Sequence, residues 1–131
     1  MNIIIADDDS NLLSMVVSHL QSIGHKAVCV GDGNELFEKL KEFMADVVIL
    51  DINMPGLDGL AAFEKLRNLE EYKKIPAIIW SGLKIPEGEN VASKNTKVRF
   101  IKKPFSLVQL DLLIGEITGP AILHGFDSYF S

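Results

Sequence analysis

Residues 3–9, IIIADDD, run from three isoleucines directly into three consecutive aspartates. The apolar part predicts a short buried strand over residues 1–6. The carboxylates that follow it repel one another: at an effective dielectric near 20, two unit charges about 4 Å apart interact by roughly 4 kcal/mol. That is a large share of a domain stability of about 5–15 kcal/mol. The three carboxylates must therefore gain a compensating partner or separate into water.

The same order of strand and helix recurs along the chain. Strand-like apolar segments cover residues 1–6, 26–30, 46–50, 77–80 and 98–101. Apolar residues at helical spacing follow four of them, in the sets Leu12, Leu13, Val16, Val17, Leu20; Leu36, Phe37, Leu40, Phe43; Leu60, Phe63, Leu66, Leu69; and Leu107, Leu110, Leu113, Ile114, Ile117. Residues 84–97 contain a proline, a glycine and few apolar groups, so we expect a short or irregular fourth helix. Continuously apolar strands separated by helices predict an α/β fold, doubly wound, with a parallel five-stranded sheet.

Composition narrows the class of protein. The 131 residues suit one domain, and 18 acidic against 13 basic residues give a net charge of −5, which argues against direct DNA binding. No apolar run approaches the roughly 18 residues of a membrane span, so no membrane insertion is expected. Cys29 is the single cysteine and is expected to be a small buried strand residue. Together these features predict a cytoplasmic protein.

Polar residues follow the predicted strands where each of four strands ends. They are Asp7 and Asp8, Asp51, Ser81, and Lys102 and Lys103. In an open parallel sheet the carboxyl ends of the strands form one edge, where ligands bind. Carboxylates suit Mg²⁺, a lysine suits phosphate oxygens, and an aspartate can act as a nucleophile that forms an acyl phosphate. This set therefore predicts a hard cation beside a phosphoryl group.

Four motifs in this order resemble the receiver domains of two-component response regulators: DDD at 7–9, DINMPGLDG at 51–59, WSG at 80–82 and KKPF at 102–105. The resemblance covers residues 1–118, leaves residues 119–131 as a tail, and is to single-domain receivers of the chemotaxis type. It implies a flavodoxin-like (βα)5 fold with strand order 2-1-3-4-5. Such a protein is not an enzyme in the ordinary sense, although it phosphorylates and dephosphorylates itself with magnesium.

Carried over by position, the resemblance gives Asp51 the role of phosphoacceptor, which takes its phosphoryl group from a histidine kinase or a histidine phosphotransfer protein. Asp8 would bind Mg²⁺ or Mn²⁺ directly, and Asp7 would bind it directly or through water. Asn53 would contribute its backbone carbonyl oxygen. Asp51 would complete this metal site.

The resemblance also implies a switch. Lys103 would contact the phosphoryl oxygens, the Ser81 hydroxyl would move to bond the acyl phosphate, and the Phe100 ring would turn inward behind it. The surface around the fourth and fifth strands would then bind a downstream protein in a phosphorylation-dependent way.

Other interpretations compete for individual residues. Phe100 also fits a plain core position, and Lys102 fits a solvated neighbour of Lys103. Asp9, Asp32 and Asp58 fit helix caps or turns, the default role of aspartate before a helix.

Other interpretations compete for the whole chain as well. A receiver excised from a larger regulator or hybrid histidine kinase would carry the same motifs, although Met1 and the aromatic tail favour a stand-alone protein. An aspartate-nucleophile phosphatase of the haloacid dehalogenase type would need an acid where Asn53 stands. A flavodoxin-like carrier would surround its phosphate with hydroxyls and amides, and a degenerate receiver would act only by binding. The tail, with Ile122, Leu123, Phe126, Tyr129 and Phe130, is expected to be partly ordered, to pack on its own domain or to dock a partner.

Overall fold

The computed structural model describes residues 1–82 and 97–119. Its elements are β1 (Asn2–Ala6), α1 (Ser10–Ser22), β2 (Lys26–Val30), α2 (Gly33–Leu40), β3 (Val47–Asp51), α3 (Gly59–Asn68), β4 (Ala77–Ser81), β5 (Val98–Lys102) and α5 (Leu107–Thr118). The strands pair in parallel in the order β2-β1-β3-β4-β5, which confirms the predicted fold. The expected fourth helix and residues 120–131 of the expected tail lie outside the described residues.

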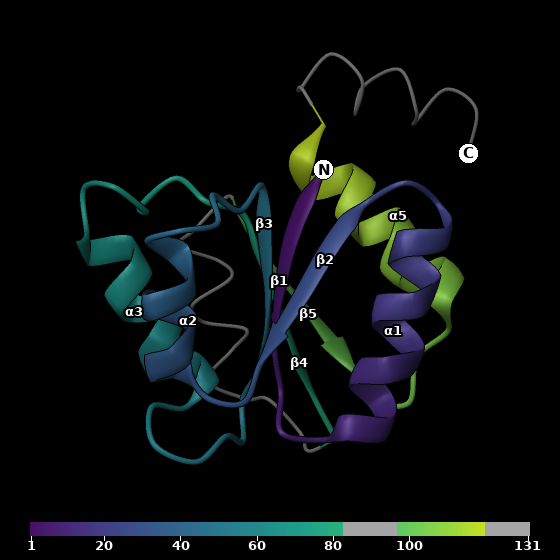
Figure 1. Ribbon diagram of the computed structural model, residues 1–131, viewed down its shortest axis with the longest axis horizontal. Coiled ribbons are helices and arrows are strands. Elements are labelled where there is room, and N and C mark those ends of the chain that lie inside the picture. The colour runs from purple at the N-terminus through teal and green to yellow at the C-terminus, as the bar shows by residue number, and fades with distance from the viewer. Residues whose placement is uncertain (83–96, 120–131) are drawn as a thin grey trace.

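Helices cover both faces of the sheet, with α2 and α3 on one side and α1 and α5 on the other (Figure 1). Two apolar cores result because side chains alternate between the faces along each strand. Ile4, Val48 and Ile79 point toward α2 and α3. Ile3, Ile49 and Ile78 point toward α1 and α5. Burial on both faces explains why the strands are apolar without alternation.

Three helices begin at aspartates, as the sequence suggested. Asp9, Asp32 and Asp58 are the N-caps of α1, α2 and α3, and their carboxylates accept backbone N–H bonds from the first turn. α5 instead begins with a capping box between Ser106 and Gln109. These caps set where each helix leaves the carboxyl edge of the sheet.

Three expectations need correction. Leu69 was expected in the third helix, but α3 ends at Asn68 and Leu69 is its extended C-cap. Cys29 is exposed, because β2 is an edge strand that the helices cover only in part. The second helix was expected to include Phe43, but α2 ends at Leu40 and the chain continues in turns, with the Phe43 N–H bonded to the Lys39 carbonyl. The Phe43 ring still packs against the core beneath α2 and α3.

Over residues 1–82 and 97–119, no helix is long and apolar enough to cross a membrane.

Candidate functional site at the carboxyl edge of the sheet

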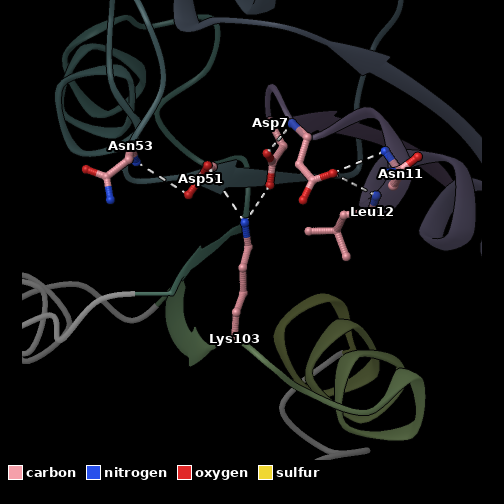
Figure 2. Close-up of polar contacts among 7 residues, drawn as sticks. Asp7, Asn11, Leu12, Asp51, Asn53 and Lys103 are labelled. Carbon is pink, nitrogen blue, oxygen red and sulfur yellow. Dashed lines mark hydrogen bonds and ion pairs between the residues drawn. The ribbon is translucent and has the colours of Figure 1, made fainter.

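The predicted site residues meet where the strands end. Asp7 follows β1, Asp51 is the last residue of β3, and Lys103 follows β5. Figure 2 shows the Lys103 side chain extending from the end of β5 to the Asp7 and Asp51 carboxylates. Three segments far apart in the sequence thus place their charges together, as predicted for the carboxyl ends of parallel strands.

The three consecutive aspartates have three different environments. Asp7 is fully buried; one of its oxygens accepts the Asp9 N–H at 2.8 Å and the other accepts the Lys103 ammonium at 2.8 Å. Asp8 is exposed. Asp9 caps α1, where its Oδ1 accepts the N–H groups of Asn11 and Leu12. The repulsion is therefore relieved in three ways. Asp7 pairs with Lys103, Asp8 is exposed to solvent, and Asp9 lies at a helix N-terminus, which favours negative charge.

The Asp51 carboxylate is buried and only weakly compensated. The residue is 6 % exposed, its Oδ1 lies 3.4 Å from the Asn53 nitrogen, and its Oδ2 lies 3.8 Å from Lys103 Nζ. Burial and the neighbouring Asp7 carboxylate raise the pKa of Asp51 from 3.8 to about 6, against the opposing effect of Lys103. Asp51 is therefore charged at neutral pH, and its carboxylate is more basic than an ordinary one.

The loop after β3 holds Asp51 by a close approach of backbone to backbone. α3 begins at Gly59, and a Cβ at this position would overlap the Asp51 carbonyl group. The Gly59 N–H also bonds to the Ile52 carbonyl at 3.2 Å. Gly56 has φ +70°, a left-handed conformation that glycine adopts without strain. The glycines of the DINMPGLDG motif thus let α3 start directly against the strand that carries Asp51.

Ser81 and Phe100 lie on the neighbouring strands. Ser81 is fully buried at the end of β4, and its carbonyl oxygen accepts the Lys103 N–H at 2.8 Å. Phe100 is half-buried in β5 and packs against the core beneath α2 and α3. The structure therefore places Ser81 at the strand ends and Phe100 in the core on the α2 and α3 side, and their roles in a switch remain predictions. Lys102 is exposed, as expected for a solvated neighbour.

A divalent cation fits the donor set. One carboxylate oxygen from each of Asp7, Asp8 and Asp51 lies within 4.8 Å of the other two. Two oxygens on one Mg²⁺ are at most about 4.2 Å apart, because each bond is about 2.1 Å long. Small side-chain movements would therefore let the three carboxylates share one ion. Lys103 balances only one of the three negative charges, so a second positive charge would also relieve the repulsion.

Sequence reasoning missed one residue of this site. Trp80 pairs in register with Asp51, is fully buried, and has Lys103 Nζ over its ring at 5.3 Å. The sequence contained a signal for Trp80. It precedes Ser81 at the end of a strand, and register partners on neighbouring strands face the same side of the sheet. The sequence analysis treated Trp80 only as part of the WSG motif and not as a neighbour of Asp51.

Comparison with known proteins identifies the arrangement. The sequence pattern described as the response regulator receiver domain matches residues 3–115. The response regulator RR06 of Streptococcus pneumoniae is 30% identical over 110 residues, covering 84% of this chain and 49% of that protein. The sensor kinase/phosphatase CqsS of Vibrio cholerae is 30% identical over 116 residues, covering 88% of this chain and 16% of that protein. A hybrid signal transduction histidine kinase, K of Dictyostelium discoideum, is 34% identical over 121 residues, covering 84% of this chain and 10% of that kinase.

Solved structures agree. The chemotaxis protein CheY4 of Vibrio cholerae superposes with a TM-score of 0.80 at 25% identity, covering 88% of this chain and 97% of that one. The signal receiver domain of a histidine kinase from Syntrophus aciditrophicus gives a TM-score of 0.78 at 26% identity, with 89% of each chain covered. Among these curated sequence relatives, by contrast, the chain spans half or less of each protein's length.

Proposed function

Because this chain belongs to the response regulator receiver family, which acts in two-component signalling, we propose that Asp51 accepts a phosphoryl group from a phosphohistidine donor with the help of Mg²⁺. The observation that carries the proposal is the buried Asp51 carboxylate, with a pKa of about 6, beside the Asp7 and Asp8 carboxylates and the Lys103 ammonium. A nucleophile, the oxygens for a cation and a group for phosphate oxygens are thus present at one edge.

The transfer proceeds by attack of an Asp51 oxygen on the phosphorus atom. The new O–P bond makes an acyl phosphate, the P–N bond of the donor breaks, and its electron pair stays on the imidazole nitrogen. Asp7, Asp8, Asp51 and the Asn53 carbonyl would hold Mg²⁺, which would supply positive charge for the phosphoryl oxygens. The Lys103 ammonium lies 3.8 Å from Asp51, close enough to turn to those oxygens.

The output follows from the neighbouring strands. The Ser81 hydroxyl bonds the acyl phosphate, and Phe100 turns toward the space behind it, which changes the surface of β4 and β5 for a downstream protein. The position of Ser81 at the end of β4 and the half-buried ring of Phe100 in β5 support this part.

We assign the receiver to residues 1–118 and a separate tail to residues 119–131. A histidine kinase or histidine phosphotransfer protein is the donor, and the site of action is the cytoplasm.

The first test uses phosphoramidate, a small donor with the same kind of P–N bond. The intact mass of the protein should increase by one phosphoryl group in the presence of Mg²⁺, and not in the presence of EDTA. Asp51→Asn is the matched variant, because it keeps the shape of the side chain and removes the nucleophilic charge. An equal mass gain in that variant would overturn the assignment of Asp51.

A further inference from the structure

Trp80 lies against the site on the same face of the sheet as Asp51. The two residues are register partners across β3 and β4, and Trp80 is also the register partner of Ile101 on β5. Trp80 is fully buried in the core beneath α1 and α5. The indole therefore forms a wall beside the strand ends from which Asp51 and Lys103 project.

Two side chains of the segment after β5 contact this one indole. Lys103 Nζ lies over the ring, 5.3 Å from its centroid. The Phe105 ring stacks on it at 5.1 Å between centroids, with 24° between the ring planes. Trp80 thus contacts both residues that flank Pro104.

The indole is not explained by stability alone. Within residues 1–82 and 97–119 its Nε1 is a buried donor without a hydrogen-bond partner, and burying such a group is destabilising. An aliphatic side chain at this position would bury no donor, but it would offer no ring face to an ammonium. An aromatic side chain at position 80 therefore stabilises the Lys103 ammonium in a way that an aliphatic side chain could not.

Lys103 needs such support. A lysine side chain loses rotamer entropy when it is fixed in one conformation. Asp7 holds the ammonium from one side at 2.8 Å, whereas Asp51 lies at 3.8 Å. A ring face within about 6 Å attracts an ammonium electrostatically, which opposes that loss of entropy.

We propose that Trp80 is a positioning residue, whose indole face holds the Lys103 ammonium at the Asp51 carboxylate in readiness for the phosphoryl oxygens. The role of Trp80 in phosphoryl transfer rests on the proposed function, whereas the contact between Trp80 and Lys103 is observed independently of it. The contact that carries the proposal is the one between the Trp80 ring and Lys103, so the effect of Trp80 on transfer would pass through Lys103.

The contact has a spectroscopic signature that does not depend on phosphorylation. Methylene protons over an indole face are shielded by its ring current, so the Lys103 Cε protons should resonate upfield of those of the exposed Lys102. Trp80→Leu should abolish this shift, and Trp80→Phe should keep part of it. An unchanged Lys103 shift in Trp80→Leu would overturn the proposal even if Asp51 is phosphorylated normally.

The consequence is tested by the rate of phosphorylation from phosphoramidate. A loss of about 0.5–2 kcal/mol corresponds to a roughly two- to thirty-fold slower transfer in Trp80→Leu, measured with both proteins saturated with Mg²⁺. Trp80→Phe should recover most of the rate. In a Lys103→Met background the Trp80→Leu change should have no further effect, because both changes remove the same positioned ammonium.

Ile78→Val is the matched control, because Ile78 is fully buried on the same strand and in the same core. It loosens packing without removing a ring face. An equal loss of rate in Ile78→Val and Trp80→Leu would assign the effect to packing and overturn the proposal. If the wild-type protein accepts no phosphoryl group, the proposed function fails, while the lysine resonances still decide whether Trp80 holds Lys103.

Discussion

Lys103 Nζ lies 2.8 Å from Asp7 Oδ2 and 3.8 Å from Asp51 Oδ2, so the lysine pairs with the carboxylate beside the proposed nucleophile rather than with the nucleophile itself. Asp7 is fully buried, and this pair compensates its charge. The pair also competes with a metal ion, because the same Asp7 carboxylate is a proposed Mg²⁺ ligand. Metal binding and the position of Lys103 are therefore coupled.

Lys103→Met should strengthen Mg²⁺ binding. The change removes a positive charge near the ion and releases Asp7 from its partner, and we expect a roughly tenfold lower dissociation constant, equivalent to about 1.4 kcal/mol. Isothermal titration calorimetry measures it directly. Lys102→Met is the control, because Lys102 is exposed and its loss should alter the affinity less. Equal affinities in the wild type and Lys103→Met would contradict the competition.

Asp51→Asn should stabilise the metal-free protein at neutral pH. The folded pKa of Asp51 is about 6, against an ordinary value of 3.8, so between these values the folded state binds a proton that the unfolded state has lost. Stability from this group therefore falls as pH rises from about 4 to 6, and at about 1.4 kcal/mol per pH unit the charged carboxylate costs up to roughly 3 kcal/mol above that range.

Urea unfolding in EDTA measures this gain. Asp51→Asn should raise the unfolding free energy by about 1–3 kcal/mol at pH 7.5, and the difference from wild type should shrink toward pH 4. Asp8→Asn is the comparison, since Asp8 is exposed and its substitution should have a smaller effect. A loss of stability in Asp51→Asn at pH 7.5 would show that the carboxylate is better compensated than the geometry indicates.

Gly59→Ala should disturb the site through the backbone. The new Cβ would overlap the Asp51 carbonyl group, so strand and helix must separate, at about 1–3 kcal/mol of unfolding free energy. Gly115→Ala is the opposite case, because a Cβ there has nothing within 4 Å and α5 should gain up to about 1 kcal/mol. Thermal melts of the two variants should therefore move in opposite directions. A neutral Gly59→Ala would remove the close-approach explanation of this glycine.

The strands, and the meeting of Asp7, Asp51 and Lys103 at their carboxyl ends, were predictable because they depend on local patterns. Apolar runs predicted the strands. Because the carboxyl ends of parallel strands lie at one edge of the sheet, the sequence also predicted that Asp7, Asp51 and Lys103 lie close together. Helix ends were less certain: Phe43 keeps the helical spacing of its neighbours but lies beyond α2, since tertiary packing rather than periodicity fixes its ring.

The remaining features depend on distance in three dimensions. The preference of Lys103 for Asp7 over Asp51 follows from a difference of 1.0 Å that no spacing encodes. The exposure of Cys29 follows from the place of β2 at the sheet edge, which depends on how all the strands order themselves. The contact of Trp80 with Lys103 requires the register of β4 with β5 as well as the alternation of side chains.

The most direct test of the account is to locate the phosphoryl group. After incubation with phosphoramidate and Mg²⁺, borohydride reduction converts an aspartyl phosphate to homoserine, and peptide mass spectrometry reads the modified position. We predict homoserine in place of Asp51, dependent on both the donor and Mg²⁺. Modification at another residue, or none in folded protein that binds Mg²⁺, would contradict it.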